Sequence, residues 1–289
     1  LCNELEIPVQ FVHEGFVPGT LSFDSQGEMA ESSVAVNYEE FESLPLNSTD
    51  LKVVKPMLQL LRETSADRKT QYNKGMVSRV LQRYQGDFDK IIFFAGSNDW
   101  YTGMLPSFWK RSKTHSPSYV DGKDLLFDLV KYCESRNHLL VYKPHPNTNQ
   151  PVPLKSKNRL TVRHSNSIEC VECSDLVITL VSGISYLSMI HQKPTLLAGR
   201  NSLEASGSVY FLQRDWLLEE AVDEALEIGL PDHQQIAFER FFCRLMKYYL
   251  VPYSSPMGQF FGKSRGSFAE AIREMVACPG GGRSVMPGH

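Results

Sequence analysis

The chain has 289 residues, of which 42% are hydrophobic and 22% are charged, and its formal net charge is −3. This is the composition of a globular protein, and the length suits one large domain or two ordinary domains. The small negative charge gives no general argument for nucleic acid or an anionic membrane as a partner. No apolar run approaches the roughly 20 residues of a membrane span, and the N-terminus lacks the basic start and apolar core of a secretory signal.

The N-terminal part of the chain predicts one strand and two helices. Residues 8–12 form a short apolar run, which predicts a strand, and a turn-rich loop follows over residues 14–20. Residues 22–48 are polar and acidic with little periodicity, and we expect a loop there. Apolar residues recur at helical spacing within residues 50–64, and we expect a second helix over residues 68–84.

From residue 90 onward, short apolar runs alternate with amphipathic segments. Such alternation predicts βα units that build a parallel sheet. The expected strands cover residues 91–95, 139–142, 160–163, 175–180 and 194–199, and the expected helices cover residues 121–136, 167–173, 182–192, 216–228 and 233–249.

These patterns predict an α/β fold in two parts. Residues 87–230 are expected to form a Rossmann-like domain, and residues 1–86 to be the remainder of an N-terminal α/β domain with connecting helices. Closing helices are expected over residues 231–276, and the Gly- and Pro-rich residues 277–289 suggest a flexible tail. Because the first residue is Leu1 rather than Met, we expect that further residues precede it in the full protein.

One candidate site follows the predicted strand 139–142, and ligands of open α/β sheets bind outside the carboxyl ends of the strands. The sequence there is Lys143-Pro144-His145-Pro146. The two prolines restrain the backbone around the histidine, and an ammonium and an imidazole group both suit a phosphate or carboxylate. The alternative is a rigid turn at the strand exit with a surface histidine.

A second candidate site, Ser182-Gly183-Ile184-Ser185, lies between a predicted strand and a predicted helix. Ser182 is well placed as an N-cap, and Gly183 lets a ligand approach the backbone closely. Free N–H groups at a helix start favour an anion, and the hydroxyls of Ser182 and Ser185 can add hydrogen bonds to it. The alternative is an ordinary serine cap.

Two carboxylates are candidates for catalysis. Asp99 follows the predicted strand 91–95 almost directly, and a carboxylate in that place can act as a nucleophile or general base. The alternative is an Asx turn that closes the strand. Glu14, in the turn-rich loop of the N-terminal part, is a second candidate and suits acid/base assistance.

The six cysteines form no regular framework, which fits a reducing compartment. Cys170 and Cys173 have the C-x-x-C spacing of some redox and zinc sites. No second pair and no nearby pair of histidines completes a zinc site, so we expect two ordinary cysteines at a helix end.

Several of these segments, taken together, resemble a known family. The N-terminal resemblance rests on residues 14–20 followed by Asp24, Gly27 and Ser32-Ser33, and the C-terminal one on Lys143-Pro144-His145-Pro146 and on residues 175–185, 191–194 and Gly199. These segments resemble the N-terminal signature, the HP motif and the Ser-Gly block of bacterial capsule polysaccharide biosynthesis proteins, which include retaining β-Kdo transferases.

The resemblance implies a GT-B-like fold, with a CMP-linked donor bound by the second domain. Asp99 stands about where the family's Kdo transferases carry a nucleophilic Asp, although Ser97 and Asn98 replace the Gln that usually precedes it. Glu14 would assist from the other domain. The expected nucleotide-binding residues are Lys143, His145, Pro146, Ser182, Gly183 and Ser185.

The function that follows is transfer of Kdo or a related sugar from a CMP-activated donor to a glycan or glycolipid acceptor. No metal and no cofactor beyond the nucleotide sugar are expected, because Lys143, His145 and a helix N-terminus can neutralise the phosphate. Two alternatives stay open: a CDP-polyol phosphotransferase of teichoic-acid type, and a non-catalytic nucleotide-binding protein of polysaccharide export. We expect a cytoplasmic protein with no nucleic acid partner, and peripheral association with the inner membrane face stays open.

Overall fold

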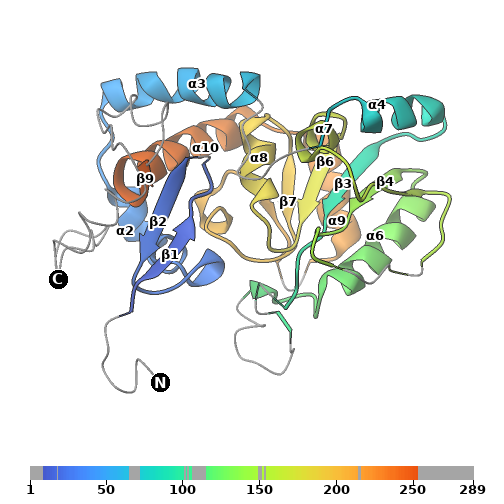
Figure 1. Ribbon diagram of the computed structural model, residues 1–289, viewed down its shortest axis with the longest axis horizontal. Helices are drawn as coiled ribbons and strands as arrows, with labels where there is room; N and C mark the ends of the chain where they lie inside the picture. The colour runs from blue at the N-terminus through green and yellow to red at the C-terminus, as the bar shows by residue number, and fades with distance from the viewer. Residues whose placement is uncertain are drawn as a thin grey trace. The chain divides into compact units, whose positions relative to one another are not determined.

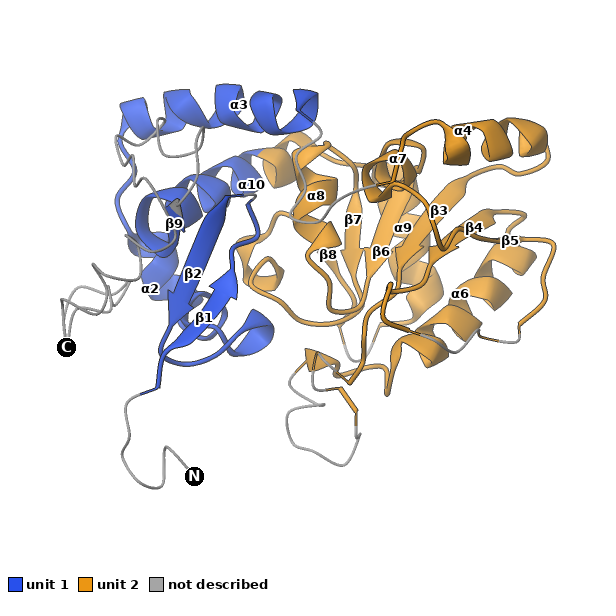
Figure 2. Ribbon diagram, viewed as in Figure 1, with its two compact units in different colours: residues 1–69, 236–289 blue, residues 70–235 orange. Residues whose placement is uncertain are grey.

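The computed structural model describes residues 9–17, 19–64, 72–100, 102, 104–105, 115–148, 152, 154–213 and 216–252. The chain forms two compact units, Leu1–Lys69 with Ile236–His289, and Thr70–Gln235 (Figure 2). Within the described residues, none of the helices has the length and apolar character that a membrane crossing requires.

The first unit contains a small antiparallel sheet with the strand order β1-β2-β9 (Figure 1). β1 (Phe11–Glu14) pairs with one side of β2 (Thr20–Asp24), and β9 (Leu250–Pro252) pairs with the other side. The helical segments of this unit are η1 (Met29–Glu31), α1 (Ser33–Val36), α2 (Tyr38–Ser43), α3 (Ser48–Glu63), most of α10 (Asp232–Arg244) and the π-helical η4 (Leu245–Tyr249).

Helix α3 confirms the prediction made for residues 50–64, and its start is capped from both sides. The Asn47 side chain accepts a hydrogen bond from the Asp50 N–H, and the Asp50 carboxylate accepts one from the Asn47 N–H, which is a capping box. The Lys247 ammonium lies 2.7 Å from the same carboxylate and ties α3 to η4. The residues that α3 buries are Val54, Met57, Leu58 and Leu61.

The expected loop over residues 22–48 is wrong, since the segment contains β2 and several short helical pieces. Its secondary structure depends on distant partners: β2 pairs with β9, more than 200 residues away in the chain. Phe41 of α2 packs edge-on against Phe241 of α10, with ring centroids 5.6 Å apart. Packing of this kind leaves no periodic signal in a short polar segment.

The second unit is built on a parallel sheet of six strands with the order β5-β4-β3-β6-β7-β8. The parallel α/β arrangement predicted from the alternating segments is therefore confirmed. The strands are β3 (Ile91–Ala95), β4 (Leu139–Lys143), β5 (Arg159–Thr161), β6 (Leu176–Thr179), β7 (Thr195–Leu197) and β8 (Tyr210–Phe211). The helical segments are α4 (Met76–Leu81), η2 (Gln82–Tyr84), α6 (Gly122–Ser135), α7 (Ser167–Glu172), α8 (Ile184–Ile190), η3 (Glu204–Ser206) and α9 (Leu218–Ile228).

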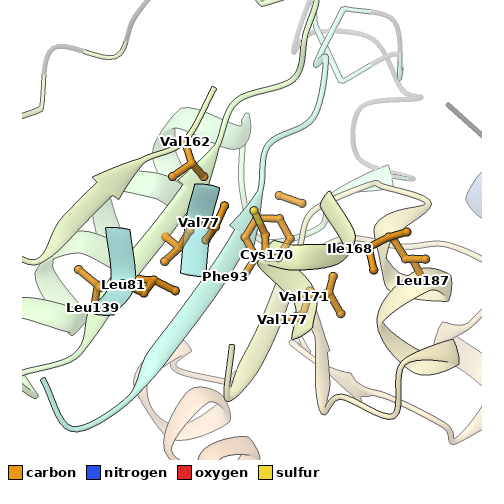
Figure 3. Packing of buried hydrophobic residues seen from close by; sticks show 12 residues of the cluster. Val77, Leu81, Phe93, Leu139, Val162, Ile168, Cys170, Val171, Val177 and Leu187 are labelled. Carbon is orange, nitrogen blue, oxygen red and sulfur yellow. The ribbon is translucent and has the colours of Figure 1, made fainter. Parts of the chain in front are cut away.

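The core of this unit lies between the sheet and the helices α4, α7 and α8 (Figure 3). Alternate residues of each strand point to this face, so Phe93 of β3, Val141 of β4 and Val177 of β6 all join the cluster. On the opposite face of the sheet, the rings of Phe94 and Tyr142 stack with centroids 5.5 Å apart. Both faces of the sheet are thus buried, as expected for strands that read as continuous apolar runs.

Helix α4 is shorter than predicted and belongs to the second unit, although residue 86 was the expected domain boundary. The described part of the predicted helix 68–84 is α4 and η2, and residues 65–71 lie outside the described residues. Gly75 has φ 99° and precedes the helix. The buried carboxylate of Glu169 in α7 accepts hydrogen bonds from the N–H groups of Gly75 and Ser78, at 2.8 and 3.0 Å. This capping carboxylate holds α4 on α7 and hence on the sheet.

Candidate functional site

The strand order places a topological switch point at the carboxyl edge of the sheet. From β3 the chain runs outward through β4 and β5, and then crosses back to β6 on the other side of β3. This corresponds to the 3-2-1-4-5-6 order of doubly wound sheets, whose ligands bind where the direction of winding reverses. The reversal lies between β3 and β6. Asp99 follows β3 and Ser182 follows β6, so the two candidate segments flank this point.

The HP turn follows β4, the neighbour of β3 on its other side, and the two strand exits pack tightly. The Gly96 N–H donates to the Lys143 carbonyl at 2.9 Å. A Cβ at Gly96 would lie 3.2 Å from the Lys143 carbonyl oxygen and 3.3 Å from Pro144 Cα, closer than most real contacts. The absence of a side chain at Gly96 therefore lets the segment that carries Asp99 lie directly against the HP turn.

Within the HP turn, Pro144 is buried, Lys143 and His145 are half-buried, and Pro146 is exposed. The Asn147 N–H donates to His145 Nδ1 at 3.2 Å. This bond favours the neutral tautomer with its proton on Nε2, since Nδ1 acts as the acceptor. His145 is thus set up with a donor on Nε2, as the predicted phosphate contact requires.

The Ser182 segment differs in detail from the prediction. The N-cap of α8 is Gly183 rather than Ser182, although the Ser182 hydroxyl still accepts a hydrogen bond from the Ile184 N–H at 3.3 Å. Ser185 is fully buried; its hydroxyl donates to the Ser182 carbonyl and accepts from the Asn201 side chain. A hydrogen bond from Ser185 to a ligand would require the bond to Ser182 to break, so Ser182 is the better placed of the two hydroxyls.

Asp99 follows β3 in the chain, and its side chain lies at the start of α6. Its Oδ1 accepts a hydrogen bond from the Ser97 hydroxyl at 2.5 Å, and its Oδ2 accepts one from the Gly122 N–H at 3.0 Å. Burial is the largest cause of a raised pKa of this carboxyl; the two hydrogen bonds oppose the shift, and the charges of Asp121 and Asp124 add to it. A carboxylate whose pKa is raised is a stronger base, which suits a nucleophile or general base.

The same geometry gives Asp99 a structural use, because a carboxylate at a helix start satisfies a free N–H group. Both roles predicted for Asp99, a turn-closing residue and a catalytic carboxylate, therefore stay open. Each carboxylate oxygen can accept more than one hydrogen bond, so a carboxylate that binds the Gly122 N–H can still interact with a substrate.

Glu14, the second candidate carboxylate, ends β1 in the first unit and is exposed. The loop behind it is tight: the Gly15 N–H donates to the Thr20 carbonyl at 2.8 Å, and a Cβ at Gly15 would collide with the Thr20 hydroxyl. Glu14 and Asp99 belong to different units, and their approach to each other stays a prediction.

The Asp24 carboxylate organises a loop of the first unit, a role that the sequence pattern did not predict. Its buried carboxylate accepts hydrogen bonds from the N–H groups of Gln26, Gly27 and Ser33 and from the hydroxyls of Ser33 and Tyr249, all between 2.8 and 3.2 Å. The N-terminal signature with Asp24, Gly27 and Ser33 therefore describes a loop wrapped around one carboxylate. The spacing of small and hydroxyl residues after Asp24 is the signal that points to such a loop.

The residues that the structure describes contain no group of three or more His, Cys, Asp or Glu side chains that could hold a metal ion. Asp87 and Asp89 have a D-x-D spacing, but they precede β3 and so lie at the sheet edge opposite the switch point. Cys170 and Cys173 are free thiols, and burial raises the pKa of both, that of Cys170 to about 11. Protonated thiols are poor nucleophiles and poor metal ligands.

No protein-family model matches the chain, and no curated protein matches its sequence. Among solved structures, it is similar to two Thermosulfurimonas dismutans KpsC structures. The KpsC structure described as a β-Kdo 2,7 transferase has 18% identity and a TM-score of 0.56, with 93% of this chain and 78% of that chain covered. The one described as a β-Kdo 2,4 transferase has 13% identity and a TM-score of 0.55, with 95% and 81% covered. At this identity the similarity concerns the fold, and the predicted GT-B-like α/β fold is confirmed.

Proposed function

We propose that this chain is a glycosyltransferase that transfers Kdo or a related acidic sugar from a CMP-activated donor to a glycan or glycolipid acceptor. The switch point between β3 and β6 carries the proposal, since a candidate carboxylate and a candidate phosphate-binding segment follow the two strands that flank it. The two solved structures of the same fold support it, because both are described as β-Kdo transferases.

In this proposal the donor phosphate lies between the exits of β4 and β6. These strands are separated by β3 alone, so their ends are about 10 Å apart at the usual strand spacing. The Ser182 hydroxyl would donate to the phosphate from one side, and His145 Nε2 and the Lys143 ammonium would meet it from the other. The sugar would then lie over the exit of β3, beside Asp99.

The chemistry proposed for this arrangement is a double displacement. Asp99 attacks the anomeric carbon of the donor, the bond from that carbon to the phosphate oxygen breaks, and CMP leaves with the electron pair. An acceptor hydroxyl then attacks the same carbon, the bond to Asp99 breaks, and the hydroxyl proton goes to a general base, the role predicted for Glu14. Two inversions give net retention of configuration, as in retaining glycosidases.

Nucleotide choice tests the proposal. Calorimetric titration of the full chain with CMP, CDP, UDP and GDP should show binding of CMP. CMP should also raise the midpoint of thermal unfolding, since a ligand at 100 times its Kd stabilises the native state by about 2.7 kcal/mol. CMP release from CMP-Kdo in the presence of glycan or glycolipid acceptors should follow. Turnover of a CDP-polyol instead would favour the phosphotransferase, and binding without any turnover would favour the non-catalytic protein. Binding of none of the four nucleotides would contradict the assignment.

A glycolipid acceptor would bring the protein to the inner face of the inner membrane, and we include this peripheral association in the proposal. Co-sedimentation with vesicles that contain the acceptor lipid, against vesicles without it, tests that part. Equal sedimentation with both kinds of vesicle would show that the acceptor lipid does not recruit the protein, and absence from both pellets would argue for a glycan acceptor free in the cytoplasm.

A further inference from the structure

Trp100, the residue after Asp99, is 69% exposed. Tryptophan has the largest apolar surface of any side chain and is highly buried on average. Val120, which precedes the N-cap of α6, is 54% exposed. Because the Gly122 N–H binds the Asp99 carboxylate, these two apolar side chains belong to segments that meet at the candidate nucleophile. Exposed apolar side chains beside the proposed nucleophile are candidates for contact with a substrate.

Described residues on both sides of Trp100 make backbone hydrogen bonds. The Thr102 N–H donates to the Asn98 carbonyl and the Leu105 N–H donates to the Asp99 carbonyl, both at 2.9 Å, and Met104 is fully buried. An indole has two side-chain torsions to restrict when a ligand binds, so its contact area comes at a small entropic cost.

Three carboxylates gather where the Trp100 segment meets α6. Asp121 and Asp124 lie within two residues of Gly122, whose N–H binds the Asp99 carboxylate, and their charges raise the pKa of Asp99. Each of these carboxylates can accept hydrogen bonds from hydroxyl groups. A pyranose ring has one face made of C–H groups, which can lie on an indole, and a rim of hydroxyls, which can donate to carboxylates.

We propose that Trp100 is the platform for a pyranose ring of the glycan acceptor, with the hydroxyls of that ring turned toward Asp121 and Asp124. The inference rests on the proposed glycosyltransferase function, since it places the acceptor next to Asp99. It separates two binding regions: the nucleotide at the exits of β4 and β6, and the acceptor sugar at Trp100.

The chain has three tryptophans, at positions 100, 109 and 216, so a W109F/W216F variant reports on Trp100 alone. Its emission should change on titration with neutral trisaccharides (cellotriose, maltotriose and N,N′,N″-triacetylchitotriose) and stay constant on titration with CMP. In the otherwise native chain, Trp100→Ala should bind the responding saccharide about tenfold more weakly, the loss expected for a large aromatic contact, and Trp100→Phe should recover part of it. Trp216→Ala, which removes a tryptophan 42% exposed at the start of α9, should leave saccharide affinity unchanged.

An emission spectrum of the W109F/W216F variant that no trisaccharide alters would overturn the proposal, as would a response to CMP alone, which would make Trp100 a nucleobase platform. A response to CMP-Kdo but to no trisaccharide would overturn it in favour of the donor sugar. Calorimetry with CMP on the same variant keeps the two claims apart: saccharide binding at Trp100 without any nucleotide binding supports the platform and contradicts the proposed function.

Discussion

Replacing Asp99 by Asn removes the charge of the candidate nucleophile and leaves a side chain of nearly the same shape. The carboxylate accepts one hydrogen bond from the Ser97 hydroxyl and one from the Gly122 N–H. Asn has a single carbonyl oxygen, and its amide nitrogen cannot accept the other hydrogen bond. The loss of one such bond costs about 1 kcal/mol, while removal of a charge whose burial raises the pKa offsets part of that loss. We expect the free energy of unfolding to fall by no more than about 1.5 kcal/mol.

The effect on turnover should be far larger than the effect on stability. Loss of a covalent nucleophile lowers kcat by at least about 10³-fold, and CMP affinity should change by less than about twofold because the group acts on the sugar and not on the nucleotide. CMP release from the donor measures the first quantity and calorimetric titration with CMP measures the second. Denaturant unfolding of the same preparation shows that the fold persists.

The reasoning is refuted if Asp99→Asn turns over within about tenfold of the native enzyme with its stability intact. Asp99 would then serve only to close the turn and to accept the Gly122 N–H at the start of α6, a role that Asn can also fill. A covalent sugar adduct on another residue, found by mass spectrometry, would lead to the same conclusion.

Substitution of two neighbours of Asp99 should shift the acid limb of the pH–activity profile in opposite directions. Asp99 must be ionised to attack, so activity is lost as the pH falls through its raised pKa. Asp121→Asn removes a charge that raises this pKa, so the acid limb should move to lower pH, and Asn remains a good N-cap for α6. Ser97→Ala removes a hydrogen bond that lowers the pKa, so the limb should move to higher pH. Profiles of kcat/KM against pH that move together, or not at all, would exclude Asp99 as the titrating group.

Other substitutions probe the nucleotide site and the sheet edge. His145→Ala should weaken CMP binding by about 1.5–3 kcal/mol in calorimetry, since a charge-assisted hydrogen bond is lost. Ser182→Ala should raise the donor KM but leave residual turnover, and a covalent adduct on Ser182 would contradict its binding role. Lys143→Met should weaken CMP binding more at low salt than at high salt, because exposed charges are screened. Gly199→Ala should lower the midpoint of thermal unfolding, since its Cβ would lie 2.5 Å from the Leu180 carbonyl oxygen, an overlap that costs about 1–3 kcal/mol; an unchanged midpoint would refute the packing argument.

The strands of the second unit were predictable because their apolar runs carry the signal within the run itself. Ile91–Ala95 and Leu139–Lys143 are buried on both faces, so each reads as a continuous hydrophobic segment bounded by turn residues. The positions of Asp99, His145 and Ser182 at strand exits followed from those runs. The adjacency of the three exits depends on the strand order, which the structure supplies.

The rest of the fold and of the site could not be predicted, because it depends on contacts between distant parts of the chain. β2 pairs with β9, and β8 is a two-residue strand beside β7, so neither has a pattern of its own. Ser185 reads as a ligand-facing serine, yet the side chain of Asn201 reaches back to it and buries its hydroxyl. Asp24 reads as a loop residue, and Tyr249, 225 residues later, supplies one of its hydrogen bonds. Local sequence cannot specify partners at such separations.

Hydrogen–deuterium exchange with and without CMP tests most directly whether the switch point at the ends of β3 and β6 is a nucleotide site. The account predicts slower exchange in peptides that contain residues 143–148 and 181–185, a smaller effect over residues 96–100, and no protection with UDP or GDP. Unchanged exchange at all three segments under saturating CMP, or protection confined to peptides of the first unit, would contradict it.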